Sequence, residues 1–146
     1  MDYDPELVQI FKDESDVLLQ ELQGILEKLE EDTQLEAVSK NLELYGQVVD
    51  RMMGAAKSLS FNRIGKLCEL GKMVGYKSSQ AKDENLNQIV IAFLFDATEH
   101  LKEMIINLPS SESQDAKIAM SATLMSRLKW LVEKFKHIER GSVAIE

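Results

Sequence analysis

The segment VVDRMMGAAKSLSF, residues 48–61, carries side chains whose types and spacing could do chemistry. Residues three or four apart share one side of a helix, so Asp50, Met53, Gly54 and Lys57 would lie on one face. A face that combines charged groups with a glycine that leaves space can bind a partner, but this segment contains no histidine to act as a nucleophile. The predicted partner-binding residues are Arg51, Met53, Gly54 and Lys57.

Other nucleophiles are scarce in this chain. It holds two histidines, His100 and His137, and one cysteine, Cys68. A single cysteine forms no intramolecular disulfide and suits a reducing cytoplasm. His100 is explained as a partly buried histidine of a bundle, and His137 as a cation near a helix C-terminus. Glycine-rich phosphate loops and local Ser/His/Asp signatures are absent from the sequence, so we expect no metal ion and no cofactor.

Five segments have apolar residues at helical spacing, and each is bounded by polar residues or a proline. We therefore predict an all-α fold: an antiparallel up-down four-helix bundle with an additional C-terminal fifth helix. Residues 1–140 would form this domain, and residues 141–146 a flexible tail or linker. The predicted helices cover Asp4 to about Glu31, about Gln34 to Lys57, about Phe61 to Lys77, about Glu84 to Leu108 and about Asp115 to Glu139.

The same periodicity predicts which side chains are buried. The second helix has the clearest seam, with apolar residues alternating by three and four from Leu35 to Leu59. The first helix is expected to bury Leu7 and Phe11, and the fourth Ile89 and Phe93.

Charge and hydropathy exclude some functions. A formal charge of −8 argues against nucleic-acid binding, which needs a basic surface. The longest apolar run, IVIAFLF, is too short to span a bilayer, and the acidic N-terminus differs from a secretory leader, so we expect a soluble, cytoplasmic protein. Residues 1–33 hold eleven acids against two lysines, and residues 51–82 hold seven bases against one acid. These segments could attract each other within the bundle, or the basic one could bind an acidic partner.

The helix order, the opening PELVQIFKDESDVLLQELQGILEKLE and the segment around Asp50 together resemble a histidine-containing phosphotransfer (HPt) domain. The resemblance is to the type at the N-terminus of chemotaxis histidine kinases. That family carries H-x-x-K-G on its second helix. In this register Asp50 replaces the histidine, Met53 replaces the lysine, and Lys72 replaces the third-helix acid that orients the histidine. Gly54 keeps the family's residue type, so the resemblance implies a degenerate phosphotransfer site at Asp50, Met53, Gly54 and Lys72.

The resemblance implies a non-catalytic interaction module of bacterial two-component or chemosensory signalling. Its partner would be a response-regulator receiver domain or a histidine kinase component. A carboxylate facing the acidic pocket of a receiver is a poor nucleophile there and is repelled by it, so phosphotransfer through Asp50 should be lost. Asp50 and Lys72 could instead form an ion pair. Its acid would lie on the second helix and its base on the third, the reverse of the family's histidine and acid.

Three alternatives stay open at this point. SQAKD, Ser79–Asp83, matches the S-Q-x-x-D pattern of small helical phosphatases that act on receivers, with Gln80 positioning water and Asp83 supporting it; a loop followed by a helix cap explains the same residues. His100 could act as a displaced relay histidine. The chain could also be a structural helical dimer joined through Ile91 and Leu94, whereas the main hypothesis is a monomer or weak homodimer.

Overall fold

The computed structural model describes residues 3–113 and 122–141, and these are helical apart from short connecting segments. The prediction of an all-α fold is confirmed for this part of the chain. The predicted tail, residues 141–146, lies outside the described residues except for its first residue. The helices are α1 (Pro5–Glu31), α2 (Leu35–Ser58), α3 (Asn62–Ala81), α4 (Glu84–Ile106), the 3-10 helix η1 (Ser110–Glu112) and α5 (Ala122–Gly141).

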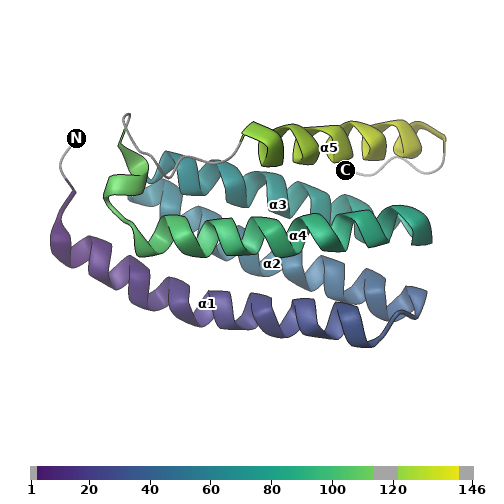
Figure 1. Ribbon diagram of the computed structural model, residues 1–146, viewed down its shortest axis with the longest axis horizontal. Helices are drawn as coiled ribbons and strands as arrows, with labels where there is room; N and C mark the ends of the chain where they lie inside the picture. The colour runs from purple at the N-terminus through teal and green to yellow at the C-terminus, as the bar shows by residue number, and fades with distance from the viewer. Residues whose placement is uncertain (1–2, 114–121, 142–146) are drawn as a thin grey trace.

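The first four helices lie side by side along the long axis of the molecule, and consecutive helices run in opposite directions (Figure 1). Helix α2 packs against α1 and α3, and α4 packs against α1 and α3 from the other side. Helix α5 covers the α3–α4 side. This arrangement leaves the outer surface of α2 free of other described helices.

Local side-chain caps mark the starts of α1 and α4. The Asp4 side chain caps α1 through the backbone N–H of Glu6, and Pro5 occupies the first turn, where its missing N–H costs nothing. Helix α3 continues to Ala81, beyond the predicted end at Lys77, and the serine hydroxyls of this polar segment are satisfied by carbonyl groups within the helix. Ser78 donates to the carbonyl of Gly75, for example, at 3.1 Å.

Two predictions of buried residues were wrong by one position. Val8 rather than Leu7 faces the core of the bundle, and Leu7 is 45% exposed. In α4, Val90 and Leu94 are fully buried, whereas Ile89 is 42% exposed. Both errors fall where apolar residues are consecutive, so the sequence alone leaves two possible rotations of the helix. The neighbouring helices select one of them.

A buried hydrogen bond joins α2 to α4. The Tyr45 hydroxyl lies 2.8 Å from Oγ1 of Thr98. Thr98 donates its own proton to the Leu94 carbonyl at 2.7 Å, so Tyr45 must be the donor in the first bond. Burial raises the pKa of Tyr45 above its ordinary value. The tyrosine ring is thus held in place by packing and by one polar contact across the core.

Candidate functional site

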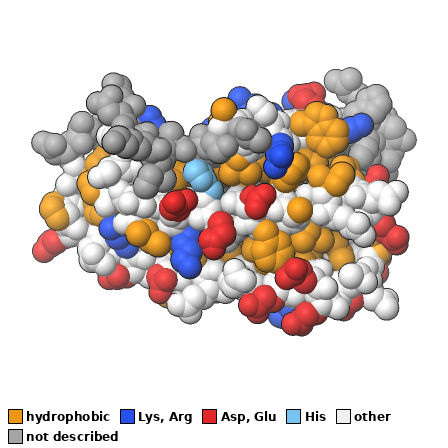
Figure 2. Space-filling model, viewed as in Figure 1, with side chains coloured by type: hydrophobic (Ala, Val, Ile, Leu, Met, Phe, Trp, Pro, Cys, Tyr) orange, Lys and Arg blue, Asp and Glu red, His pale blue; other side chains and the backbone are white. Residues whose placement is uncertain are grey.

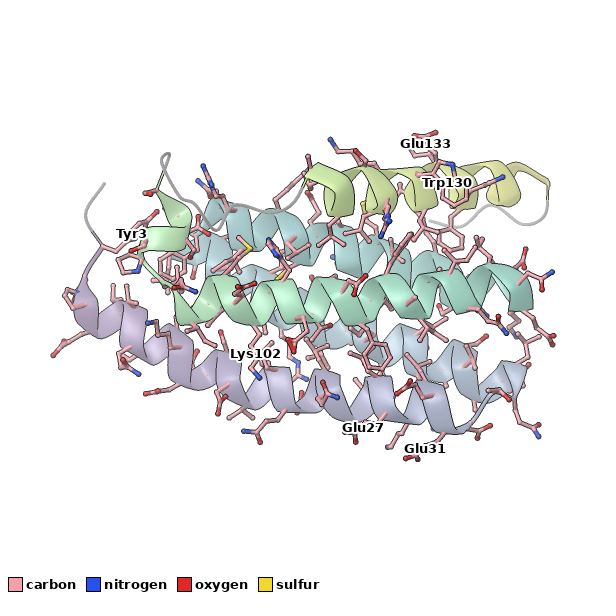
Figure 3. The ribbon with its side chains drawn as sticks, viewed as in Figure 1. Tyr3, Glu27, Glu31, Lys102, Trp130 and Glu133 are labelled. Carbon is pink, nitrogen blue, oxygen red and sulfur yellow. The ribbon has the colours of Figure 1, made fainter. Side chains whose placement is uncertain are left out.

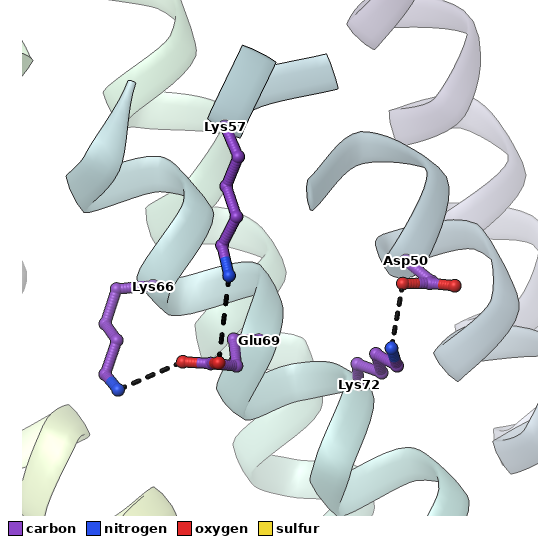
Figure 4. Close-up of polar contacts among 5 residues, drawn as sticks. All are labelled: Asp50, Lys57, Lys66, Glu69 and Lys72. Carbon is purple, nitrogen blue, oxygen red and sulfur yellow. Dashed lines mark hydrogen bonds and ion pairs between the residues drawn. The ribbon is translucent and has the colours of Figure 1, made fainter. Parts of the chain in front are cut away.

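The candidate site lies where the outer part of α2 meets α3. The Lys72 ammonium on α3 lies 3.0 Å from Oδ1 of Asp50 on α2 (Figure 4). Their side chains are 31% and 43% exposed, so the ion pair is partly shielded from water. The expected pairing of Asp50 with Lys72 is therefore present, and it joins two helices.

Tyr76 extends this contact along α3. It lies one turn after Lys72, and its ring covers Gly46 so closely that a Cβ at Gly46 would be 2.5 Å from the ring. Burial, and secondarily the Asp50 carboxylate, raise the pKa of Tyr76. The contact requires glycine at position 46, one helical turn before Asp50. Tyr76 was not predicted as part of this site, although its spacing from Lys72 places the two side chains on one face of α3.

A second charged group lies one turn further along the same interface. The Lys57 ammonium is 3.7 Å from Oε1 of Glu69, and the Lys66 ammonium is 3.0 Å from Oε2 (Figure 4). The hydrogen bond from Lys66, followed by the charges of Lys66 and Lys57, lowers the pKa of Glu69. The carbon chain of Lys57 also lies against Gly65, 3.1 Å from where a Cβ would be. Lys57 is therefore directed toward α3.

Gly54 lies on the exposed side of α2 with open space around it. A Cβ added there would have no other heavy atom within 4 Å. Arg51, one turn earlier, is directed toward α1, where its Nη2 atom lies 2.6 Å from Oε2 of Glu21. Met53 is half-buried and packs against the core. The four predicted partner-binding residues thus form a surface with Gly54 open at its centre, Arg51 paired toward α1 and Lys57 paired toward α3.

None of the predicted site residues is a histidine. Asp50, which the resemblance aligns with a histidine, is a carboxylate paired with a lysine, and a paired carboxylate attacks phosphorus poorly. Among residues 3–113 and 122–141, no group of three or more histidine, cysteine or acidic side chains is placed to hold a metal ion. The candidate site therefore consists of charged side chains, open space at Gly54 and the half-buried Met53.

The residues of the phosphatase alternative lie on two different helices. Gln80 is exposed in the last turn of α3, not in a loop as predicted. Asp83 is the N-cap of α4, and its carboxylate accepts a hydrogen bond from the Leu86 N–H at 3.0 Å. The prediction of a helix cap is confirmed for Asp83. A carboxylate held in this way is less available to orient water.

Of the two histidines, His100 is the one whose side chain the structure describes. Helix α4 holds His100 half-buried, and its Nε2 atom is buried without a hydrogen-bond partner among the described residues. A relay histidine must expose a ring nitrogen to its partner, and the buried Nε2 atom does not meet this requirement. The backbone of His137 belongs to α5, but its side chain lies outside the described residues.

The residues proposed for a dimer seam are also placed differently from the prediction. Leu94 is fully buried in the core, so the prediction that it is exposed was wrong. Ile91 is half-buried. Helix α5 and helix α1 cover much of α4, which explains why its apolar run is internal.

Comparison of the chain with protein-family models, curated proteins and solved structures finds no match. None of the helices in the described part of the chain is long and apolar enough to cross a membrane. A function for this chain therefore has to be inferred from the side chains where α2 meets α3. Glu21 and Glu69 were not predicted as partners of this site, although the Arg51–Glu21 ion pair joins the acidic residues 1–33 to the basic residues 51–82, as one interpretation of the charge pattern expected.

Proposed function

We propose that the chain is an HPt-like interaction module that has lost phosphotransfer. In this proposal α1–α4 form the antiparallel four-helix bundle of HPt domains, with α5 added. The module acts in cytoplasmic two-component or chemosensory signalling and binds a receiver domain or a histidine kinase component. It is not an enzyme, and it works as a monomer or weak homodimer.

The Asp50–Lys72 ion pair is the observation that carries the proposal. The resemblance places a nucleophilic histidine and its orienting acid at these two positions. Here a carboxylate and an ammonium lie 3.0 Å apart, so the charges are exchanged while contact between the two helices is kept. A compensated exchange preserves the surface of the bundle and removes the nucleophile, as expected for a module retained for binding.

Binding is assigned to the surface formed by Arg51, Met53, Gly54 and Lys57. Gly54 leaves space for a partner to approach the backbone of α2, and the ion pairs on either side hold Arg51 and Lys57 in place. A half-buried methionine adapts well to different partners. This surface combines an apolar group, two cations and open space at Gly54, features that suit the acidic pocket of a receiver.

A phosphorylation assay tests the loss of phosphotransfer. We expect no transfer of label when the purified protein is mixed with a labelled phospho-receiver or an active chemotaxis-type kinase, because Asp50 replaces the imidazole. Acid-labile phosphate on His100 or His137 would instead support the displaced relay. Faster loss of phosphate from the receiver, abolished in Gln80→Ala, would support the phosphatase.

Calorimetry with a matched pair of variants tests the binding surface. Gly54→Arg places bulk in the proposed contact, whereas Gly24→Arg places the same bulk on α1, where a Cβ also meets no other heavy atom within 4 Å. Against receivers and kinases encoded nearby, we expect Gly54→Arg to lose binding and Gly24→Arg to keep it, with both retaining wild-type helicity. Equal affinity of the two variants would contradict this surface.

A further inference from the structure

A recess lies at the opposite end of α2 from Gly54, between the end of α1 and the starts of α2 and α4. Its volume is about 220 Å³. This is below the range of pockets that enclose drug-sized ligands and is enough for a single amino-acid residue, its peptide group and side chain together. The residues that line it are Leu29, Thr33, Leu35, Val38, Glu84, Asn87, Gln88 and Ile91.

Asn87 is the unusual residue of this recess. It is 4% exposed, and neither its amide nitrogen nor its amide oxygen has a hydrogen-bond partner among the described residues. Buried amides in folded proteins are almost always paired, because desolvating both a donor and an acceptor is costly. Asn87 lines the recess together with four aliphatic residues, so a bound group that reaches its buried amide could supply both missing hydrogen bonds.

The surroundings of the recess are strongly acidic. Residues 27–36 and 82–84 meet at this end of the molecule and hold seven acids against two lysines. One of these lysines, Lys82, is paired with Glu36 at 3.3 Å. Figure 3 shows Glu27 and Glu31 extending from α1 away from the bundle, and Figure 2 shows acidic side chains along this edge of the molecule. The negative charge therefore extends well beyond the walls of the recess.

We propose that this recess binds a basic peptide segment. The Asn87 amide offers one acceptor and one donor group, and a peptide group carries the complementary pair. Aliphatic walls suit the carbon stem of a lysine or arginine, whose charged end would reach Glu84 at the rim. A chain with several positive charges matches acids spread over the whole bundle end better than a single small amine does. This site is separate from the Gly54 surface and does not depend on the function proposed for it.

NMR titration of the isotopically labelled protein tests the site directly. The probe is the capped heptapeptide Gly-Arg-Lys-Gly-Arg-Lys-Gly, and its control is Gly-Asp-Glu-Gly-Asp-Glu-Gly. We expect the basic peptide to shift the side-chain amide resonances of Asn87 and the backbone signals of the residues around it. The acidic peptide should leave these signals unchanged.

Two variants and one control separate recognition from general attraction. Asn87→Leu should weaken binding of the basic peptide about tenfold, because it removes the amide but keeps the volume. Glu84→Gln should weaken binding as well. Glu99→Gln removes the same charge about 22 Å away along α4 and should have little effect.

Several results would overturn the proposal. Equal affinity of wild type and Asn87→Leu would show that the buried amide is not used by the peptide. If Glu84→Gln and Glu99→Gln weaken binding equally, the peptide is attracted by the overall charge of the protein and not by this recess. If Asn87 shows contacts only to water, and neither peptide changes its signals, then the recess holds buried water and does not bind the peptide.

Discussion

The carboxylate of Glu112, in η1, accepts a hydrogen bond from the backbone N–H of Ile64 at 2.9 Å, and another from Arg63 at 3.0 Å. These N–H groups belong to the first turn of α3, whose own N-cap residue, Phe61, makes no side-chain cap. A residue far along the chain therefore caps this helix. The acid also lies at the positive end of the α3 dipole, which strengthens the contact.

Removing this cap should destabilise the protein. We expect Glu112→Ala to lower the free energy of unfolding by about 1 kcal/mol, because two N–H groups lose their acceptor. Glu112→Gln should lose less, since an amide oxygen still accepts one bond. Glu103→Ala, an exposed acid on α4, serves as the control and should change stability little. Urea unfolding followed by circular dichroism provides the measurement, and equal stabilities of the two alanine variants would contradict the capping role.

Helix positions were largely predictable because apolar periodicity is a local property of the sequence. The α2 seam through Leu42, Tyr45, Val49 and Met52 is buried as predicted. The register of α4 was not predictable, because IVIAFLF is apolar on every side and only the packing of α1, α3 and α5 determines which residues turn inward. Local pattern thus defines a helix, and tertiary contact defines its rotation.

The candidate site could be predicted in part. The expected Asp50–Lys72 contact required only the register of two neighbouring helices, and the structure contains it. Glu112 carried no signal for its role, because its partners are backbone groups on a distant helix. The unpaired amide of Asn87 was equally hidden, since the sequence shows an asparagine but not its burial.

The Asp50–Lys72 ion pair should contribute modestly to stability. A double-mutant cycle with Asp50→Asn and Lys72→Gln should give a coupling free energy of about 0.2–1 kcal/mol, the range for partly exposed pairs. The coupling should shrink in 1 M salt, because screening weakens charges that solvent reaches. Chemical unfolding of the four proteins at two salt concentrations measures it. A coupling of zero at low salt would mean that the contact does not hold α2 to α3.

Alkaline pH should destabilise the fold, because the buried thiol of Cys68 and the buried hydroxyl of Tyr45 lose their protons more readily in the unfolded chain. Burial raises the pKa of the Cys68 thiol from 9.0 to about 12. Above pH 9 the unfolded chain therefore binds fewer protons than the folded one, and the free energy of unfolding falls as pH rises, approaching about 1.4 kcal/mol per pH unit for this group. Below pH 9 the thiol is protonated in both states and contributes no pH dependence.

The thiol contribution can be isolated by substitution. Cys68→Ala creates a small cavity and lowers stability at every pH, so the quantity to compare is the slope between pH 9 and pH 10. We expect a shallower slope in Cys68→Ala than in wild type. The remaining slope should come partly from Tyr45, because burial also raises the pKa of its hydroxyl group. Identical slopes in both proteins would show that the thiol is not shielded as the structure indicates.

The closest approach of α2 and α3 depends on Gly75. A Cβ at this position would lie 2.9 Å from the carbonyl oxygen of Leu42 and 3.2 Å from the backbone nitrogen of Gly46, and backbone atoms cannot move aside as a flexible side chain can. We expect Gly75→Ala to destabilise the protein by about 1–3 kcal/mol through overpacking, despite the better helix propensity of alanine. Gly54→Ala makes the same change in open space and should stabilise by up to about 1 kcal/mol. Urea midpoints of the two variants should therefore move in opposite directions from wild type, and a shift of Gly75→Ala toward higher urea would contradict the tight packing of these helices.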